Sequence, residues 1–155
     1  MSHRVSDILT ADRTACEVEV ASKKRALEKV SELIASADPA LSAGPVFDCL
    51  LARERLGSTG LGHGVGLPHG RLKQLTQPIG AFVRLVSGVD YDAVDREPVD
   101  LLFGLLLPDG APETNLELLA SLAELFDDSG LRERLRATDR CQALFELISR
   151  AKDGD

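Results

Sequence analysis

One segment, Val99 to Leu107 (VDLLFGLLL), constrains the fold of this chain more than any other part of it. The composition favours a β-strand, and apolar side chains fall on both of its faces. Such a strand is buried only at the centre of a sheet that helices cover on both sides. We therefore expect an α/β fold in which helices flank a mixed β-sheet, with this segment as a central strand.

Three other stretches predict further strands. Residues 14–20 (TACEVEV) alternate as a half-buried strand does, and residues 78–86 (PIGAFVRLV) predict a longer strand of the core. Val65 and Leu67 alternate just before Pro68, which fits a short strand.

Helices are predicted between these strands. Ser22 can cap a helix with one apolar face, formed by Ala26, Leu27, Val30, Leu33 and Ile34. A second helix is expected from about Ser42 to about Leu56, where Gly57 ends it.

Three more helices are expected after the central strand. A turn at residues 108–110 leads to Pro112, which suits the first turn of a helix. Helical spacing predicts that its apolar face carries Leu116, Leu119, Ala120, Ala123 and Phe126. Residues 129–137 predict a short charged helix, and Thr138 is expected to cap the last one. The apolar positions of that last helix are Ala143, Leu144, Leu147 and Ile148.

Length and composition limit the classes of protein to which the chain can belong. With 155 residues, 44% of them hydrophobic, it can build one core, and we expect a single domain over residues 1–155. A formal net charge of −7 disfavours nucleic-acid binding. No apolar run reaches the roughly 20 residues of a membrane helix, and we find no targeting signal. We expect a soluble, cytoplasmic protein without membrane insertion.

The three cysteines, Cys16, Cys49 and Cys141, lie far apart in the sequence, and none is close to a histidine. An odd number without a CxxC pair favours reduced, mostly buried thiols over a disulfide framework or a zinc site.

Glycine and histidine are concentrated in residues 57–71 (GSTGLGHGVGLPHGR), which hold six of the thirteen glycines and two of the three histidines. A phosphate-binding loop, a metal site and a phosphorylated histidine are the alternatives that this composition raises. A nucleotide P-loop needs a lysine and a hydroxyl after its last glycine, and a dinucleotide site needs a different glycine spacing. Neither requirement is met, and no GxSxG elbow surrounds Ser58 or Ser121, so hydrolysis has no support.

A metal site is also disfavoured. In an extended segment His63 and His69 would lie roughly 20 Å apart, too far to share one ion. We expect no bound metal.

His69 remains as a nucleophile for a phosphoryl group. A neutral imidazole attacks through one nitrogen when an acceptor, commonly a backbone carbonyl, holds the proton on the other. Pro68 stiffens the approach, and Gly70 leaves room for the incoming group. An ordinary exposed turn at residues 68–70 is the alternative that the local sequence leaves open.

Four motifs together resemble one known family. They are Ser22 to Leu27 (SKKRAL), Leu51 to Gly60 (LARERLGSTG), Leu67 to Arg71 (LPHGR) and Pro98 to Phe103 (PVDLLF). In this order, from about Val5 to Ile148, the chain resembles the fructose/mannitol-type enzyme IIA domains of the bacterial phosphotransferase system. The nitrogen-related regulatory branch is the most similar, and the resemblance implies the fold of that family.

The resemblance implies that His69 accepts a phosphoryl group from an HPr-like carrier, without a cofactor. The chain would be a phosphohistidine intermediate and not a hydrolase, and its standing as an enzyme stays open. Arg53 matches the active-site arginine of the family, whose guanidinium would offset the phosphoryl charge. Arg55 lies about 200° further round the helix and cannot face the same site. In the regulatory branch, the phosphorylation state signals to a transporter or sensor kinase, whose identity the sequence does not specify.

One position departs from the sugar-specific members, which carry a second active-site histidine where this chain has Asn115. Asparagine can donate a hydrogen bond to phosphate but does not titrate near pH 7. We expect the phosphoryl group to be surrounded by Gly62, Gly64, Gly66, Gly70 and Asn115, with His63 as a weaker candidate. A sugar-specific IIA component that passes phosphate to a IIB domain, or a phosphate-independent protein-binding module, are the alternative functions.

Overall fold

The computed structural model describes residues 5–151, and six strands from this part of the chain form one sheet. The strands β1 (Thr14–Val18), β5 (Ile79–Val89), β6 (Val99–Pro108), β3 (Val65–Gly66) and β2 (Gly60–Gly62) follow one another across it. A further strand, β4 (His69–Leu72), also pairs with β6, beyond the end of β3.

The sheet is mixed, as the sequence predicts. β5 and β6 are antiparallel, whereas β1 runs parallel to β5, and both β3 and β4 run parallel to β6. β6 has neighbours on both sides and all but two of its residues are buried, so its predicted central position is confirmed.

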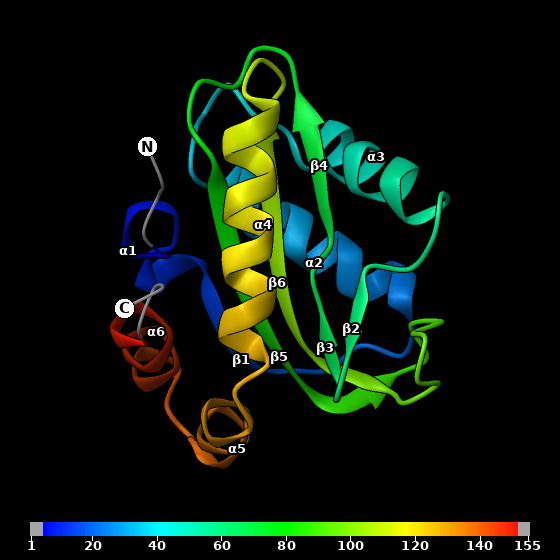
Figure 1. Cartoon of the computed structure of the whole chain (residues 1–155), viewed down its shortest axis with the longest axis vertical. Coiled ribbons are helices and arrows are strands. Elements are labelled where there is room, and N and C mark those ends of the chain that lie inside the picture. Colours follow the sequence, from blue (N-terminus) through cyan, green and yellow to red (C-terminus); the bar gives the residue numbers. More distant parts are fainter. Residues whose placement is uncertain (1–4, 152–155) are drawn as a thin grey trace.

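Helices cover both faces of this sheet, with α4 (Pro112–Phe126) crossing one face and α2 (Lys23–Ala35) and α3 (Ala43–Glu54) lying on the other (Figure 1). The side chains of β6 alternate accordingly. Leu101, Phe103 and Leu105 pack with α4 and the C-terminal helices, while Leu102 and Leu106 pack with α2 and α3. The α/β prediction is therefore confirmed.

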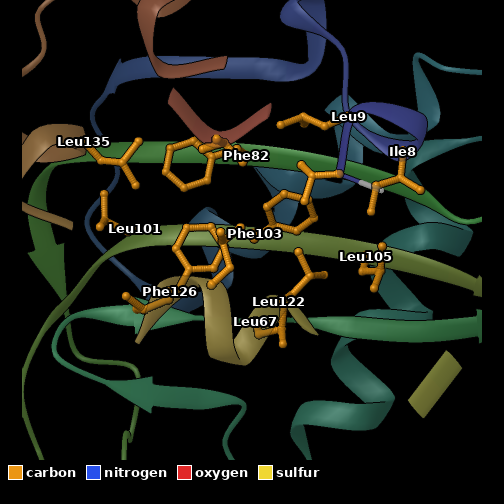
Figure 2. Close-up of a cluster of buried hydrophobic side chains, with 14 of the residues drawn as sticks. Ile8, Leu9, Leu67, Phe82, Leu101, Phe103, Leu105, Leu122, Phe126 and Leu135 are labelled. Carbon is orange, nitrogen blue, oxygen red and sulfur yellow. The ribbon is translucent and has the colours of Figure 1, made fainter. Parts of the chain in front are cut away.

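Three aromatic rings lie near the middle of the core between the sheet and α4 (Figure 2). The Phe126 ring of α4 is stacked at 6.0 Å from that of Phe82 and tilted at 5.9 Å from that of Phe103. These rings fix the end of α4 on the sheet.

Both helices of the other face begin where the sequence predicts. The Ser22 side chain accepts a hydrogen bond from Arg25 N and caps α2. α3 starts directly after Ser42, whose side chain makes no capping bond, and ends at Glu54. That end lies two residues before the predicted Leu56.

The predicted start of α4 at Pro112 and the predicted burial of Phe126 are confirmed, but most of the predicted apolar face is wrong. The buried positions are Asn115, Leu118, Leu122, Leu125 and Phe126, whereas Leu116 is 68% exposed. Leucines occur on more than one side of this helix, so helical spacing alone fits two rotations about its axis.

Two short helices, α5 (Ser129–Ala137) and α6 (Cys141–Arg150), complete this part of the chain. α6 lies beside α1 (Val5–Ile8) and β1, and α5 contacts α4 and α6 (Figure 1). The predicted capping by Thr138 is wrong, because Thr138 ends α5, donates from Oγ1 to Arg134 O, and leaves the N-cap of α6 to Arg140. None of the helices within residues 5–151 is long and apolar enough to cross a bilayer.

A disulfide joins Cys16 of β1 to Cys141 of α6, with their Cα atoms 5.2 Å apart. The expectation of reduced thiols is therefore wrong for this pair, and Cys49 alone keeps a free thiol among the described cysteines. The partners are 125 residues apart in sequence, and only the packing of α6 beside β1 brings them together.

Candidate functional site

A pocket of about 590 Å³ lies beside β4, between α3 and α4. Figure 1 shows β4 between these two helices, near one end of the sheet. The pocket is lined by Cys49, Ala52, Arg53, Leu56, His69, Gly70, Arg71, Leu107, Asp109, Pro112, Asn115, Leu116 and Leu119.

His69 opens β4 and is half-buried in the wall of this pocket. Its Nδ1 lies 2.9 Å from Leu67 O. Because a carbonyl oxygen only accepts hydrogen bonds, Nδ1 is the protonated nitrogen of the neutral ring. Nε2 then carries the lone pair and is the atom able to act as a nucleophile.

Burial lowers the pKa of His69 below its ordinary value of 6.5. The hydrogen bond to Leu67 opposes this effect, and of the two nearby charges Arg53 lowers the pKa while Glu54 raises it. A neutral, nucleophilic imidazole is therefore the form expected near pH 7.

Arg53 lies in the last turn of α3 and lines the same pocket as His69. Its Nη1 donates to Gly57 O at 2.9 Å, which leaves further N–H groups of the guanidinium for an anion. Arg55 follows the helix, is exposed, and is not part of the pocket wall.

Gly70 and Asn115 also line the pocket. A Cβ at Gly70 would lie 3.0 Å from Cys49 O, so the glycine allows β4 to pack closely on α3. Asn115 is 4% exposed; its Nδ2 donates to Pro108 O at 2.8 Å, and its Oδ1 has no hydrogen-bond partner. One amide N–H of Asn115, which we expected to contact the phosphoryl group, is thus bound to the backbone.

The structure does not bring Gly62, Gly64, Gly66 and His63 to the pocket. They lie in the β2–β3 hairpin, where His63 N donates to Asp95 Oδ2 at 2.9 Å. Val65 pairs with Leu101 and His69 with Leu105, so about 13 Å of extended strand separates the two regions. Figure 1 shows the hairpin and β4 toward opposite ends of the sheet.

Most residues of the pocket wall were not predicted as site residues, and three of them bear on its chemistry. Arg71 follows His69 by two positions in β4 and so shares its face, a relation that strand alternation could have revealed. It is exposed, 4.0 Å from Asp109 Oδ1. Leu56 and Leu116, from either side of the pocket, are 84% and 68% exposed.

Within residues 5–151, no group of three or more histidine, cysteine, aspartate or glutamate side chains is placed to hold a metal ion. The pocket wall carries one imidazole and two guanidinium groups, those of His69, Arg53 and Arg71, an arrangement suited to an anionic reactant.

Comparison with known proteins shows the family of this chain. The family described as the EIIA 2 component of the phosphoenolpyruvate-dependent sugar phosphotransferase system matches residues 7–151. The chain belongs to this family. The predicted membership of the phosphotransferase EIIA type 2 family is confirmed.

This EIIA 2 protein is similar to nitrogen regulatory proteins along nearly all of its length. The nitrogen regulatory protein of Pseudomonas aeruginosa is 43% identical over 151 residues, which cover 97% of this chain and 98% of that protein. The crystal structure of the nitrogen regulatory protein IIA-Ntr from Neisseria meningitidis has a TM-score of 0.87 at 40% identity, covering 93% of this chain and 98% of that one. The predicted similarity to the nitrogen-related branch is therefore confirmed.

The EIIA 2 fold also extends to a mannitol component. Enzyme IIAMTL of Escherichia coli, solved in complex with phosphorylated enzyme IIBMTL, has a TM-score of 0.75 at 20% identity, covering 92% of this chain and 99% of that one. At this identity the likeness concerns the fold.

Proposed function

We propose that His69 accepts a phosphoryl group from an HPr-like carrier protein, and that the phosphorylation state of this cytoplasmic domain, residues 1–155, regulates target proteins. The observation that carries the proposal is the hydrogen bond from His69 Nδ1 to Leu67 O, which leaves Nε2 as the nucleophile in a pocket with Arg53 and Arg71.

In the proposed step, the Nε2 lone pair attacks phosphorus and forms an N–P bond. The bond between phosphorus and its donor atom on the carrier breaks, and its electron pair stays on that atom. Nε2 has no proton to lose, while Nδ1–H remains on Leu67 O. The two guanidinium groups offset the charge of the transferred group without a metal or cofactor.

The rim of the pocket favours a protein as the phosphoryl donor. Leu56 and Leu116 expose apolar side chains on opposite sides of the pocket. Covering such side chains with a partner surface lowers the free energy of the complex. A small phosphate donor would leave both uncovered.

Two observations favour a regulatory output over sugar transport. The relatives named above at about 40% identity are nitrogen regulatory proteins. In addition, the family resemblance implies a second active-site histidine in sugar-specific members, at the position where this chain has Asn115. Asn115 has one amide N–H bound to Pro108 O and cannot shuttle a proton. Both observations disfavour the alternative, in which a sugar-specific IIA component passes phosphate to a IIB domain. The regulated protein is proposed to be a transporter or a sensor kinase.

The reaction class is tested by the chemistry of the adduct. Incubation with phosphoenolpyruvate, enzyme I and an HPr-type carrier should give a phosphoprotein that is labile in acid and stable in base. An acid-stable adduct would indicate a phosphate ester on a hydroxyl group and contradict the proposal.

The regulatory output is tested by partner affinity. His69→Ala and the mimic His69→Asp should bind a target protein with different affinities if the charge at His69 is the signal. Equal affinities of both variants and the wild type would instead support a phosphate-independent binding module, which the exposed leucines also allow.

A further inference from the structure

A buried polar cluster lies beside the pocket and is not explained by the proposed reaction. It consists of Lys23, Glu54, Thr59 and Tyr91, which come from α2, α3, the loop before β2 and the segment after β5. Glu54 is 8% exposed and Tyr91 is fully buried. A carboxylate in such surroundings costs free energy unless its oxygens are paired.

Both oxygens of Glu54 are paired. Oε1 accepts hydrogen bonds from Thr59 Oγ1 and, at 3.0 Å, from the Tyr91 hydroxyl. Oε2 accepts from Thr59 N at 3.2 Å and forms an ion pair with Lys23 Nζ at 2.9 Å. Thr59 is therefore held to Glu54 by its main chain and its side chain at once.

Two hydrogen bonds to main-chain carbonyls connect this cluster to the His69 ring. Thr59 O accepts a hydrogen bond from Leu67 N at 3.0 Å, and Leu67 O accepts from His69 Nδ1 at 2.9 Å. The carbonyl that selects the tautomer of His69 is thus positioned by the residue that Glu54 holds.

The same carboxylate also orients Arg53. Adjacent residues of a helix point about 100° apart, so anchoring Glu54 in the cluster fixes the rotation of the last turn of α3 and leaves Arg53 at the pocket. Gly57 N donates to Glu54 O at 3.1 Å, and Gly57 O accepts from Arg53 Nη1 at 2.9 Å.

We infer that Glu54 is a positioning residue for phosphoryl transfer, which acts through Thr59 and Leu67 on the His69 ring and through the end of α3 on Arg53. This inference rests on the proposed function of His69. Loss of an ordinary structural residue would lower stability, but the folded molecules would still transfer phosphate normally. Loss of a positioning residue also slows transfer by the folded molecules.

The test compares Glu54→Gln and Tyr91→Phe with Ile148→Val, a change in the core of α6 that lowers stability without touching the pocket or the cluster. For the folded fraction of each variant, kcat and KM for the phosphorylated carrier are measured, and ¹⁵N NMR reports the tautomer of His69. Tyr91→Phe keeps the ring and removes one donor to Glu54, so it tests the inference even if Glu54→Gln does not fold.

We expect Glu54→Gln to lower kcat by about tenfold or more, because a small misplacement of reacting groups is costly, with KM within about twofold. Tyr91→Phe should show a smaller loss of kcat, and both variants should contain more of the Nε2-protonated tautomer. Ile148→Val should keep the kcat and tautomer of the wild type.

The inference is overturned if both cluster variants keep the kcat and the tautomer of the wild type, or if only KM changes. Failure of the proposed function gives a different result, since the wild type would then carry no phosphoryl group on His69.

Discussion

The two ring nitrogens of His69 have different surroundings, and this difference determines which of them can react. Nδ1 donates a hydrogen bond to Leu67 O, which leaves the lone pair on Nε2. Partial burial favours the neutral ring, and Arg53 supplies positive charge to the same pocket. A nucleophile and a cation are thus combined without a second titrating histidine.

The lowered pKa of His69 predicts a titration below pH 6.5 in the unphosphorylated protein. As pH falls below that value, the unfolded chain takes up the proton first, so stability present above pH 6.5 decreases toward the lowered folded pKa. NMR titration of the ring, assigned with His69→Ala, measures this. A midpoint at or above 6.5 would contradict the prediction.

Arg53 and Arg55 offer a matched pair for testing charge in the pocket, because one lines it and the other is exposed elsewhere. We expect Arg53→Ala to reduce the rate of phosphoryl transfer by about a hundredfold or more, as removal of a transition-state donor does. Arg55→Ala should change the rate by less than about twofold. A rapid-quench assay measures both rates. Equal effects of the two substitutions would show that Arg53 does not stabilise the transferred phosphoryl group.

At the scale of elements, close approach of helices to strands builds the pocket and the core beneath it. Gly70 lets α3 lie against β4, and Gly104 lets α2 lie against β6. A Cβ at Gly104 would overlap Val30 Cγ1, in contrast to Gly44 of α3, where a Cβ would have open space.

This contrast predicts opposite effects of the same substitution. Gly104→Ala should lower the free energy of unfolding by about 1–3 kcal/mol through overpacking. Gly44→Ala should raise it by about 0.5–1 kcal/mol, because alanine restricts the unfolded chain and favours a helix. Urea unfolding of both variants measures the difference, and a change of equal sign would be contrary to this packing.

Most elements could be predicted from periodicity, as the positions of α2 and β6 show. The rotation of α4 could not, because its leucines fit two faces and only the sheet selects between them. For the site, sequence reasoning and the family motifs pointed to His69 and Arg53, which share one pocket. The grouping of His69 with the hairpin glycines followed closeness in sequence, but an extended strand carries them apart.

At the scale of the whole molecule, the disulfide between Cys16 and Cys141 ties β1, near the start of the described chain, to its last helix. The loop that it closes spans 125 residues of sequence separation. It therefore restricts the unfolded state across the sheet and most of its covering helices, far from the pocket wall.

Reduction of this bond should lower the free energy of unfolding by about 2–4 kcal/mol. Denaturant unfolding with and without dithiothreitol measures the effect, and a double variant Cys16→Ser/Cys141→Ser should not respond to the reductant. Equal stability of the oxidised and reduced wild type would contradict the prediction.

Because a reducing cytoplasm opens such bonds, thiol labelling in cells would also test the proposed location.

The central claim is that the phosphoryl group resides on His69, and site-resolved phosphorylation tests it most directly. Intact-mass measurement after incubation with phosphoenolpyruvate, enzyme I and an HPr-type carrier should show one added phosphoryl group on the wild type. His63→Ala, altered in the hairpin away from the pocket, should be phosphorylated to the same extent, while His69→Ala should not be phosphorylated. If His69→Ala accepts the group as the wild type does, the assignment of the nucleophile is wrong.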